Sequence, residues 1–342
     1  MNLAFKEMKK NKSKFLIFGA IVFLISALTF MIAGLANGLS QDNAALIKEM
    51  PDGHFYMATD AEDNYALSTI SPEQQDSILN KYEDATALSI QMGIFFNEEG
   101  KQQSVAFATT SDSEQFPQVN KGEIIVDQSL QEDGYEIGDI LTNNQYSGQW
   151  KIVGFSEQTK FNHAAVAFIH PDNFAEMYRT FDKQLMYMPG DAAAIDGLTA
   201  YSNKDFLNTI PSYSAEQLSL NLIIWFLVVI SGLLFAIFFY MMNIQKTGLF
   251  GILKAIGVKT KTLFVMMWVQ MLFITALALL LSMGLSQLIQ QIAPAGMPFH
   301  LTLDTTLLFA VIFLVIGFIG ATLSGLQIKK IQPLQAIQQG EM

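Results

Sequence analysis

Residues 15–41 read FLIFGAIVFLISALTFMIAGLANGLSQ, and this stretch contains no charged side chain. Three later stretches are also free of charge, at residues 217–245, 262–303 and 305–328. A membrane-spanning helix needs about 20 apolar residues, so the first, second and fourth stretches each suit one helix. The third stretch is longer and is interrupted by Pro294, Gly296 and Pro298. We therefore predict four transmembrane helices, at residues 15–38, 219–242, 263–290 and 305–327.

The composition agrees with a membrane protein. Of the 342 residues, 51% are hydrophobic and only 15% are charged, and the mean hydropathy is +0.30. Soluble domains carry about a quarter charged residues, which argues against an ordinary soluble enzyme. The absence of cysteine excludes disulfides, thiolate metal ligands and cysteine nucleophiles. The net charge of −11 argues against nucleic acid as a partner.

The distribution of charge predicts the orientation in the cell membrane. Of the 20 basic residues, 11 lie in residues 1–14, 243–262 and 328–342, whereas residues 39–218 hold 28 of the 31 acidic residues. Because short lysine-rich segments stay in the cytoplasm, we expect both termini inside and residues 39–218 outside. Residues 291–304 then form a short outer loop.

The first helix also shares its basic flank and apolar core with cleaved signal peptides. Its apolar stretch is longer than that of a typical signal, and no convincing small-residue cleavage site follows it. We therefore interpret residues 15–38 as a permanent anchor.

The outer segment is long enough to form its own domain. Strand-like runs occur at residues 54–58, 104–109, 123–126, 150–155 and 164–169. Start signals at Pro72 and Pro171 predict helices over residues 71–82 and 171–181, and the glycines in residues 134–141 are typical of a hairpin corner. This mixture predicts an α+β domain over residues 39–218.

The inner loop, residues 243–262, is polar and carries three glycines. Ile252, Leu253 and Ile256 lie at helical spacing, which predicts a short amphipathic helix along the cytoplasmic face. A simple interfacial turn between two membrane spans fits the same periodicity.

One helix, a large outer domain and then three helices is a layout that resembles the MacB/FtsX-type permeases of ABC transporters. Three motifs carry the resemblance over the whole chain: EIIVDQSL at residues 123–130 followed by IGD at 137–139, GILKAIG at 251–257, and IKKIQPLQAI at 328–337. The resemblance implies two permeases assembled with two separate ATPase subunits. The surfaces available to dock the ATPase are the tail at residues 329–336 and the inner segment, which consists of Gly251, Ile252, Leu253, Lys254, Ala255, Ile256 and Gly257.

Within that family the chain looks most like the heme-efflux permeases of Gram-positive bacteria, the HrtB type. The similar segments are SYSAEQ at residues 212–217, FYMMNIQK at 239–246 and MPF at 297–299. One departure is that Lys246 and Thr247 stand where the wider family often has an acidic residue, just before the inner glycine segment.

The chain has no G-x-x-x-x-G-K-[ST] motif and therefore no phosphate-binding loop for ATP. We expect it not to be an enzyme and to have no cofactor of its own. ATP and Mg²⁺ would then bind to the partner subunit, and heme would be the cargo.

Heme needs an apolar, aromatic-lined crevice and accepts an axial ligand to its iron. The predicted topology brings six candidates for heme binding to the outer membrane edge: Glu216, Met297, Tyr213, Phe55, Phe161 and His163. Glu216 is the first candidate iron ligand because it is the acidic residue beside the uncharged run of the second helix. Its alternative role is that of a solvated carboxylate favoured by the helix dipole.

Met297, between Gly296 and Pro298, is the second candidate iron ligand, although most of the 17 methionines simply fill apolar space. Tyr213 and Phe55 are equally typical of aromatic packing at the membrane interface. At Phe161 the resemblance leads us to expect tyrosine, and phenylalanine cannot ligate iron. His163 can do so, although a lone histidine beside a strand is more often structural. We interpret Tyr240 as packing.

The sequence thus predicts the permease subunit of an ABC pump that takes heme from the outer leaflet of the lipid membrane. Three alternatives remain: the same fold exporting an antibiotic peptide or a lipid, a signal-transmitting permease that moves no cargo and activates an outer partner, and an ATP-independent receptor. The motifs at residues 251–257 and 329–336 argue against the receptor.

Overall fold

The computed structural model describes residues 2–157, 159–293 and 297–330. The described chain divides into two compact units. The membrane unit comprises residues 2–37, 219–293 and 299–330, and the inserted domain comprises residues 38–157 and 159–218 together with 297–298.

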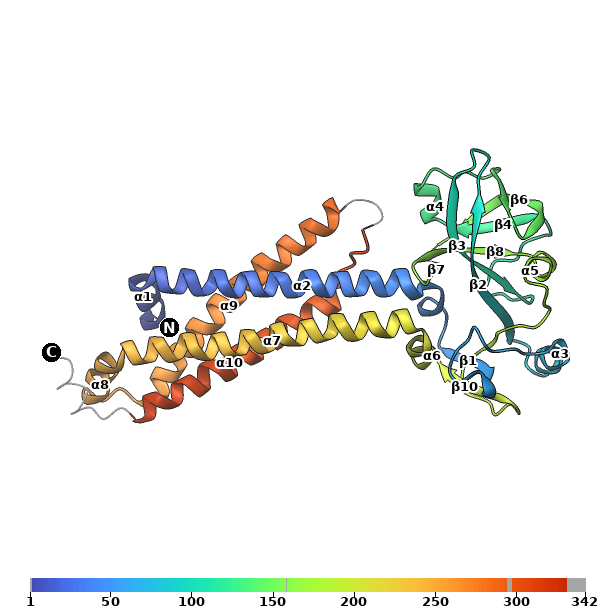
Figure 1. The fold of residues 1–342 in the computed structure, drawn as a ribbon. Coiled ribbons are helices and arrows are strands. Elements are labelled where there is room, and N and C mark those ends of the chain that lie inside the picture. The colour runs from blue at the N-terminus through green and yellow to red at the C-terminus, as the bar shows by residue number, and fades with distance from the viewer. Residues whose placement is uncertain (1, 158, 294–296, 331–342) are drawn as a thin grey trace. The chain divides into compact units, whose positions relative to one another are not determined.

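In the part of the chain that the structure describes, four helices are long and apolar enough to cross a membrane. They are α2 (Lys12–Lys48), α7 (Pro211–Gln245), α9 (Thr260–Ile292) and α10 (Leu303–Lys330) (Figure 1). The predicted arrangement of one helix, a domain and three helices is therefore confirmed. Each helix extends beyond its predicted span at both ends, because flanking residues continue the helix on both sides of the apolar stretch.

Among the described residues, two short helices also belong to the membrane unit. The predicted helix of the 243–262 loop is α8 (Thr247–Ala255), whereas α1 (Asn2–Lys10) has no counterpart in the sequence prediction. The tail motif predicted at residues 328–337 lies mostly beyond Lys330, outside the described residues.

Small residues let the long helices of the membrane unit approach closely. A Cβ atom at Gly320 of α10 would lie 3.0 Å from the backbone nitrogen of Ala236 and 3.1 Å from the carbonyl oxygen of Gly232, both in α7. Ser26 of α2 and Ser282 of α9 are buried and share a hydrogen bond of 2.9 Å. Such contacts are typical of helices in lipid, where burying apolar surface between helices gives no gain over lipid contact.

The inserted domain contains one sheet, which has ten strands among the described residues. Their order is β10-β1-β9-β2-β3-β8-β4-β6-β5, with β7 paired to β8. The strands are β1 (Gly53–Ala58), β2 (Thr86–Phe96), β3 (Gln102–Thr110), β4 (Glu123–Asp127), β5 (Ile140–Asn143), β6 (Tyr146–Ser156), β7 (Lys160–Phe161), β8 (Ala164–Ile169), β9 (Leu185–Pro189) and β10 (Leu198–Ser202). The pairs β3–β8 and β4–β6 are parallel and the others are antiparallel.

The helical elements of this domain are α3 (Pro72–Lys81), α4 (Ser129–Glu132), α5 (Pro171–Tyr178), α6 (Asn203–Thr209) and the 3-10 turn η1 (Thr59–Ala61). The predicted start of α3 is confirmed, since the Ser71 side chain accepts a hydrogen bond from the backbone of Gln74 and Pro72 follows it. The helix predicted at residues 171–181 ends early, at Tyr178, because Arg179 adopts a left-handed backbone with φ 55°.

The sheet has an apolar core on each face. Successive residues of a strand point to opposite faces, and Val105 and Phe107 belong to one buried cluster whereas Ala106 and Ala108 belong to another. The five predicted strands are present, and together with the helices they confirm the α+β class.

Candidate functional site

A tight hairpin positions His163. Strands β7 and β8 pair Lys160 with Ala165 and Phe161 with Ala164, so only Asn162 and His163 lie between them. Both turn residues have positive φ, 50° and 61°. Two consecutive residues of this kind form a type I′ turn, which matches the twist of the flanking strands.

This turn contacts the end of α2 through its backbone. The amide of Asn162 donates to the carbonyl oxygen of Asn43 at 2.7 Å, and the amide of His163 donates to that of Asp42 at 3.1 Å. The helical geometry of α2 is interrupted at Ala44, with φ −147° and ψ 20°. The turn therefore satisfies carbonyl groups next to a break in the helix.

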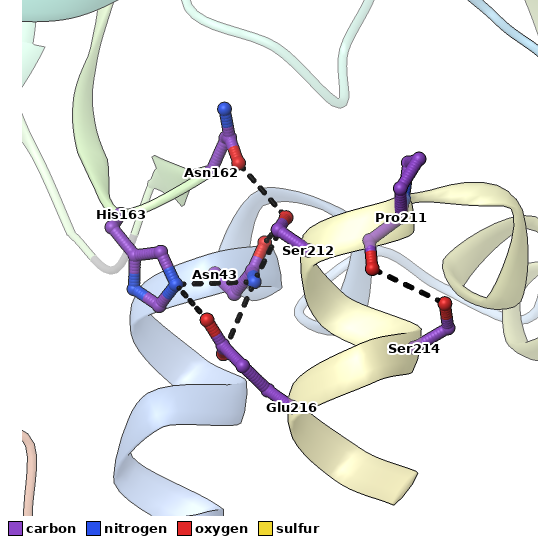
Figure 2. A network of polar contacts seen from close by, with 7 residues as sticks. All are labelled: Asn43, Asn162, His163, Pro211, Ser212, Ser214 and Glu216. Atoms are coloured by element: carbon purple, nitrogen blue, oxygen red, sulfur yellow. Dashed lines mark hydrogen bonds and ion pairs between the residues drawn. The ribbon is translucent and has the colours of Figure 1, made fainter. Parts of the chain in front are cut away.

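Glu216 faces the same turn from α7. Its Oε1 lies 2.7 Å from Nε2 of His163, and its Oε2 accepts a hydrogen bond of 3.3 Å from Nδ2 of Asn43 (Figure 2). The side chains of His163 and Glu216 are 35% and 31% exposed. The carboxylate and the imidazole are thus paired with each other and still reach solvent.

Asn43 is the buried centre of this network. Its side chain is fully covered, and its Nδ2 lies 3.1 Å from Oγ of Ser212 and 3.2 Å from Nε2 of His163. The Ser212 hydroxyl lies 2.9 Å from Oδ1 of Asn162. Side chains from α2, the turn and α7 therefore share one polar network, of which the His163–Glu216 edge is accessible.

The position of Glu216 in its helix argues against the helix-dipole alternative. The helix α7 begins at Pro211, a residue type favoured at the first helical position. Near this start, the Ser214 hydroxyl donates to the Pro211 carbonyl at 3.3 Å (Figure 2). Because Glu216 lies beyond the first turn, where the dipole effect fades, its two hydrogen bonds are the larger influence.

The remaining candidates are dispersed. Tyr213 is partly buried, and its hydroxyl accepts a hydrogen bond of 3.3 Å from Ser40. Phe55 and Phe161 are fully buried in the apolar core of the inserted domain, so these rings present no surface to a ligand. Met297 is 45% exposed and takes no part in the network as far as the described residues show.

The α8 helix, which contains most of the predicted coupling segment, has a buried and an exposed side. Phe250 and Gly251 are buried, whereas the apolar side chains of Leu249, Ile252 and Ile256 are 48%, 51% and 72% exposed. Their spacing of three and four residues places these three on one face.

The end of α8 is sharply defined. The amide of Val258 donates to the carbonyl of Leu253 at 2.9 Å and that of Gly257 to the carbonyl of Lys254 at 3.0 Å. With Gly257 at φ 94°, this is a Schellman motif, in which a left-handed glycine stops the helix. Gly257 therefore fixes where the chain leaves α8.

Sequence reasoning missed Asn43 and gave no role of its own to Ser212. Ser212 lies within the quoted SYSAEQ segment, but Asn43 follows the first apolar run without any motif around it. Only the fold brings these residues to the turn at 162–163.

Comparison with known proteins identifies the family. Residues 221–333 match the model of the FtsX-like permease C-terminal domain. The chain is 30% identical to the hemin transport system permease protein HrtB of Staphylococcus haemolyticus, over 98% of this chain and 99% of that protein. It is also 30% identical to the protein of that name in Staphylococcus epidermidis (strain ATCC 12228), over the full length of both.

One similar solved structure is the extracellular domain of the noncanonic ABC-type transporter YknZ from Gram-positive bacteria. The similarity covers 42% of this chain and 84% of the YknZ domain. The identity is 11% and the TM-score is 0.31, which is too low to support an argument. The full-length matches and the four apolar helices together establish the family. The chain is a multi-pass membrane protein of the FtsX-like family of ABC-transporter permeases, in the group that contains HrtB.

Proposed function

We propose that this chain is the permease subunit of an ABC pump that exports heme, and that heme binds at the Glu216 network. The observation that carries the proposal is the full-length similarity to permeases named for hemin transport. The accessible carboxylate–imidazole pair beside a long apolar helix supports it, because a polar site next to apolar surface suits an amphiphilic cargo.

In this proposal Glu216 ligates the heme iron by exchanging one hydrogen-bond partner. Its contact with His163 is about one-third exposed, and pairs of this kind contribute roughly 0–1 kcal/mol. Breaking the contact therefore costs little, and the released Nε2 of His163 can donate to a heme propionate. Met297 is the second candidate ligand, since its thioether is half-exposed, and Tyr213 lies one helical turn before Glu216.

The site requires residues 39–218 to lie outside the cell and both termini inside. The lysine distribution supports this orientation. Heme then reaches the site sideways from the outer leaflet, and the pump releases it outward.

The energy comes from a separate ATPase, which we propose docks on α8. The exposed Leu249, Ile252 and Ile256 form an apolar face that suits a protein partner. Two permeases and two ATPases form the proposed assembly, since two-fold symmetry is the commonest arrangement of oligomers. ATP binding and heme binding must favour different states of the permease for the pump to work.

The test is a hemin titration of the purified protein in detergent, followed by Soret absorbance. We expect a saturable shift in the wild type, an affinity lowered about tenfold or more in Glu216→Gln, and a displaced Soret band in Met297→Leu. Glu73→Gln is the matched control, because Glu73 is an exposed acid in the first turn of α3. Phe55→Leu changes a core residue and should leave the affinity unchanged.

Identical, unsaturable partitioning of hemin into all these proteins would overturn the heme assignment. Membership of the permease family would stand. Export of an antibiotic peptide or a lipid, or signalling to an outer partner, would then replace heme export.

A further inference from the structure

A nearly buried ion pair joins the first helix to the start of α8. The Glu7 carboxylate of α1 lies against the Lys246 ammonium, with 9% and 11% of the two side chains exposed. Its Oε2 accepts a hydrogen bond of 2.9 Å from Nε2 of Gln270 on α9, and that amide also lies 3.3 Å from the carbonyl oxygen of Ala4. One carboxylate thus connects α1, α9 and the residue that precedes α8.

The surroundings of this pair are apolar. Ala4 is buried against the membrane helices, and the ring of Phe5 packs edge-on against Phe273 of α9 at 5.2 Å. The ammonium of Lys246 lies 5.6 Å from the centre of the Phe15 ring on α2. Because protein rather than water surrounds the two charges, their mutual attraction is screened less and is stronger.

Further contacts hold α8 at both ends. Lys14 of α2 donates to the side chain of Gln245, directly before Lys246. At the far end, the ammonium of Lys254 donates to the carbonyl oxygen of Ile328 in α10. The start of α8 thus contacts α1 through paired charges, and its far end contacts α10.

A buried ion pair constrains position more than it adds stability. The cost of removing both charges from water offsets most of their attraction, whereas losing one partner leaves an uncompensated charge in apolar surroundings. A shift of α8 away from α1 would leave the Glu7 carboxylate without its cation. Movement of α8 therefore carries α1 with it and, through Gln270, acts on α9.

We propose that α1 is part of the apparatus that couples the ATPase to the membrane helices, with Glu7 as its positioning residue. This rests on the proposed function, in which the ATPase acts on α8. Lys246 stands immediately before α8, and the acid that pairs with it comes from α1.

The experiment measures coupling in the full permease assembled with its ATPase subunit. The variants are Glu7→Lys, Lys246→Glu, the exchanged pair Glu7→Lys/Lys246→Glu, and the uncharged pair Glu7→Gln/Lys246→Met. Lys6→Glu is the control, because Lys6 is the exposed neighbour of Glu7 on the same helix. Readouts are co-purification of the ATPase, stimulation of ATP hydrolysis by the permease, and hemin efflux per ATP.

We expect each single reversal to lower stimulation roughly twofold to thirtyfold, the range found for residues that transmit coupling. The exchanged pair should restore most of it, and Lys6→Glu should behave as wild type. The uncharged pair should fold and co-purify but remain poorly coupled. Coupling at the wild-type level in the uncharged pair would overturn the proposal, because the ion pair would then be structural only.

The readouts separate this inference from the heme assignment. A wild-type chain that stimulates the ATPase but does not move hemin contradicts heme export, while the reversal series still decides the role of Glu7. A wild-type chain that neither binds nor stimulates the ATPase overturns both.

Discussion

The pairs Glu7–Lys246 and His163–Glu216 both join distant parts of the chain, and they differ most in exposure. The first is 9% and 11% exposed and lies in the membrane unit, whereas the second is 35% and 31% exposed and lies in the inserted domain. A buried charge that loses its partner has no water to replace it. A charge that is about one-third exposed exchanges its partner for water or a ligand at little cost.

This difference separates a fixed joint from an exchangeable site. The other partner of the Glu7 carboxylate is the amide of Gln270, and among the described residues no second cation lies within salt-bridge distance of it. Glu216 instead belongs to a network with a buried centre at Asn43 and an accessible edge at His163. We therefore expect substitutions at the two pairs to differ sharply in their effect on stability.

The largest expected effect is at Lys246. Lys246→Met leaves the Glu7 carboxylate buried without its cation, and such changes cost about 3–5 kcal/mol. Glu7→Gln/Lys246→Met should recover most of this loss, because uncharged replacements of a whole buried pair are often close to neutral. Thermal unfolding in detergent checks both variants. A single variant as stable as wild type would show that this pair is not a fixed joint.

Lys183 tests the same argument within the inserted domain, because it is a buried cation facing a ring. It is 8% exposed and lies 5.8 Å from the centre of the Phe174 ring. Burial lowers the pKa of Lys183 from 10.5 to about 8. Below pH 8 both the folded and the unfolded states hold the proton, and folding bears the full cost of burying the ammonium.

Above pH 8 the folded state releases this proton while the unfolded state keeps it, so stability rises with pH. The rise amounts to about 3 kcal/mol if followed to pH 10.5. Burial raises the pKa of Tyr178 to about 12, which lowers stability above pH 10, so the useful window is pH 8–10. Lys183→Met should be more stable at pH 7 and lose the rise.

Fluorescence of Trp150 can follow this transition, because Trp150 is buried in the core that contains Phe174. Replacing the other two tryptophans, Trp225 and Trp268, by phenylalanine isolates its signal. If stability of the Lys183→Met variant depended on pH as that of its parent does, the rise in stability could not be assigned to Lys183.

The sequence predicts the membrane helices well because a bilayer imposes one simple requirement, a long uncharged run. The strand predictions are less complete. The strand β2 (Thr86–Phe96) has several small or polar residues on its buried positions, among them Ser89, and so lacks the alternating pattern on which strand prediction relies. The α1 helix was missed because residues 1–14 were interpreted only as the basic flank of the first membrane span, although these nine helical residues are amphipathic.

The candidate site was only partly predictable. Position relative to the membrane singles out Glu216, but its partners are Asn43 and His163, and the sequence contains no local signal for that pairing. Phe55 and Phe161 were chosen for their aromatic character, which a core and a heme crevice use equally. Only tertiary packing distinguishes the two uses.

The smallest expected effect is at His163. His163→Gly removes the contact with Glu216, worth roughly 0–1 kcal/mol. The same change relieves a left-handed backbone at φ 61°, which costs about 1–2 kcal/mol for a residue with a Cβ atom. The two terms nearly cancel, so this variant should unfold within about 1 kcal/mol of wild type. Its hemin affinity should fall less than that of Glu216→Gln, because Glu216 keeps its carboxylate and only the hydrogen bond from His163 to a heme propionate is lost.

His163→Ala is the matched control, since it loses the same contact but retains the strained backbone. It should be less stable than His163→Gly by about 1 kcal/mol, which isolates the turn from the hydrogen bond. If His163→Gly instead lost as much stability as Lys246→Met, exposure would not distinguish the two pairs. Glu216 would then be locked in place like Glu7, and it would not be free to exchange partners with a cargo.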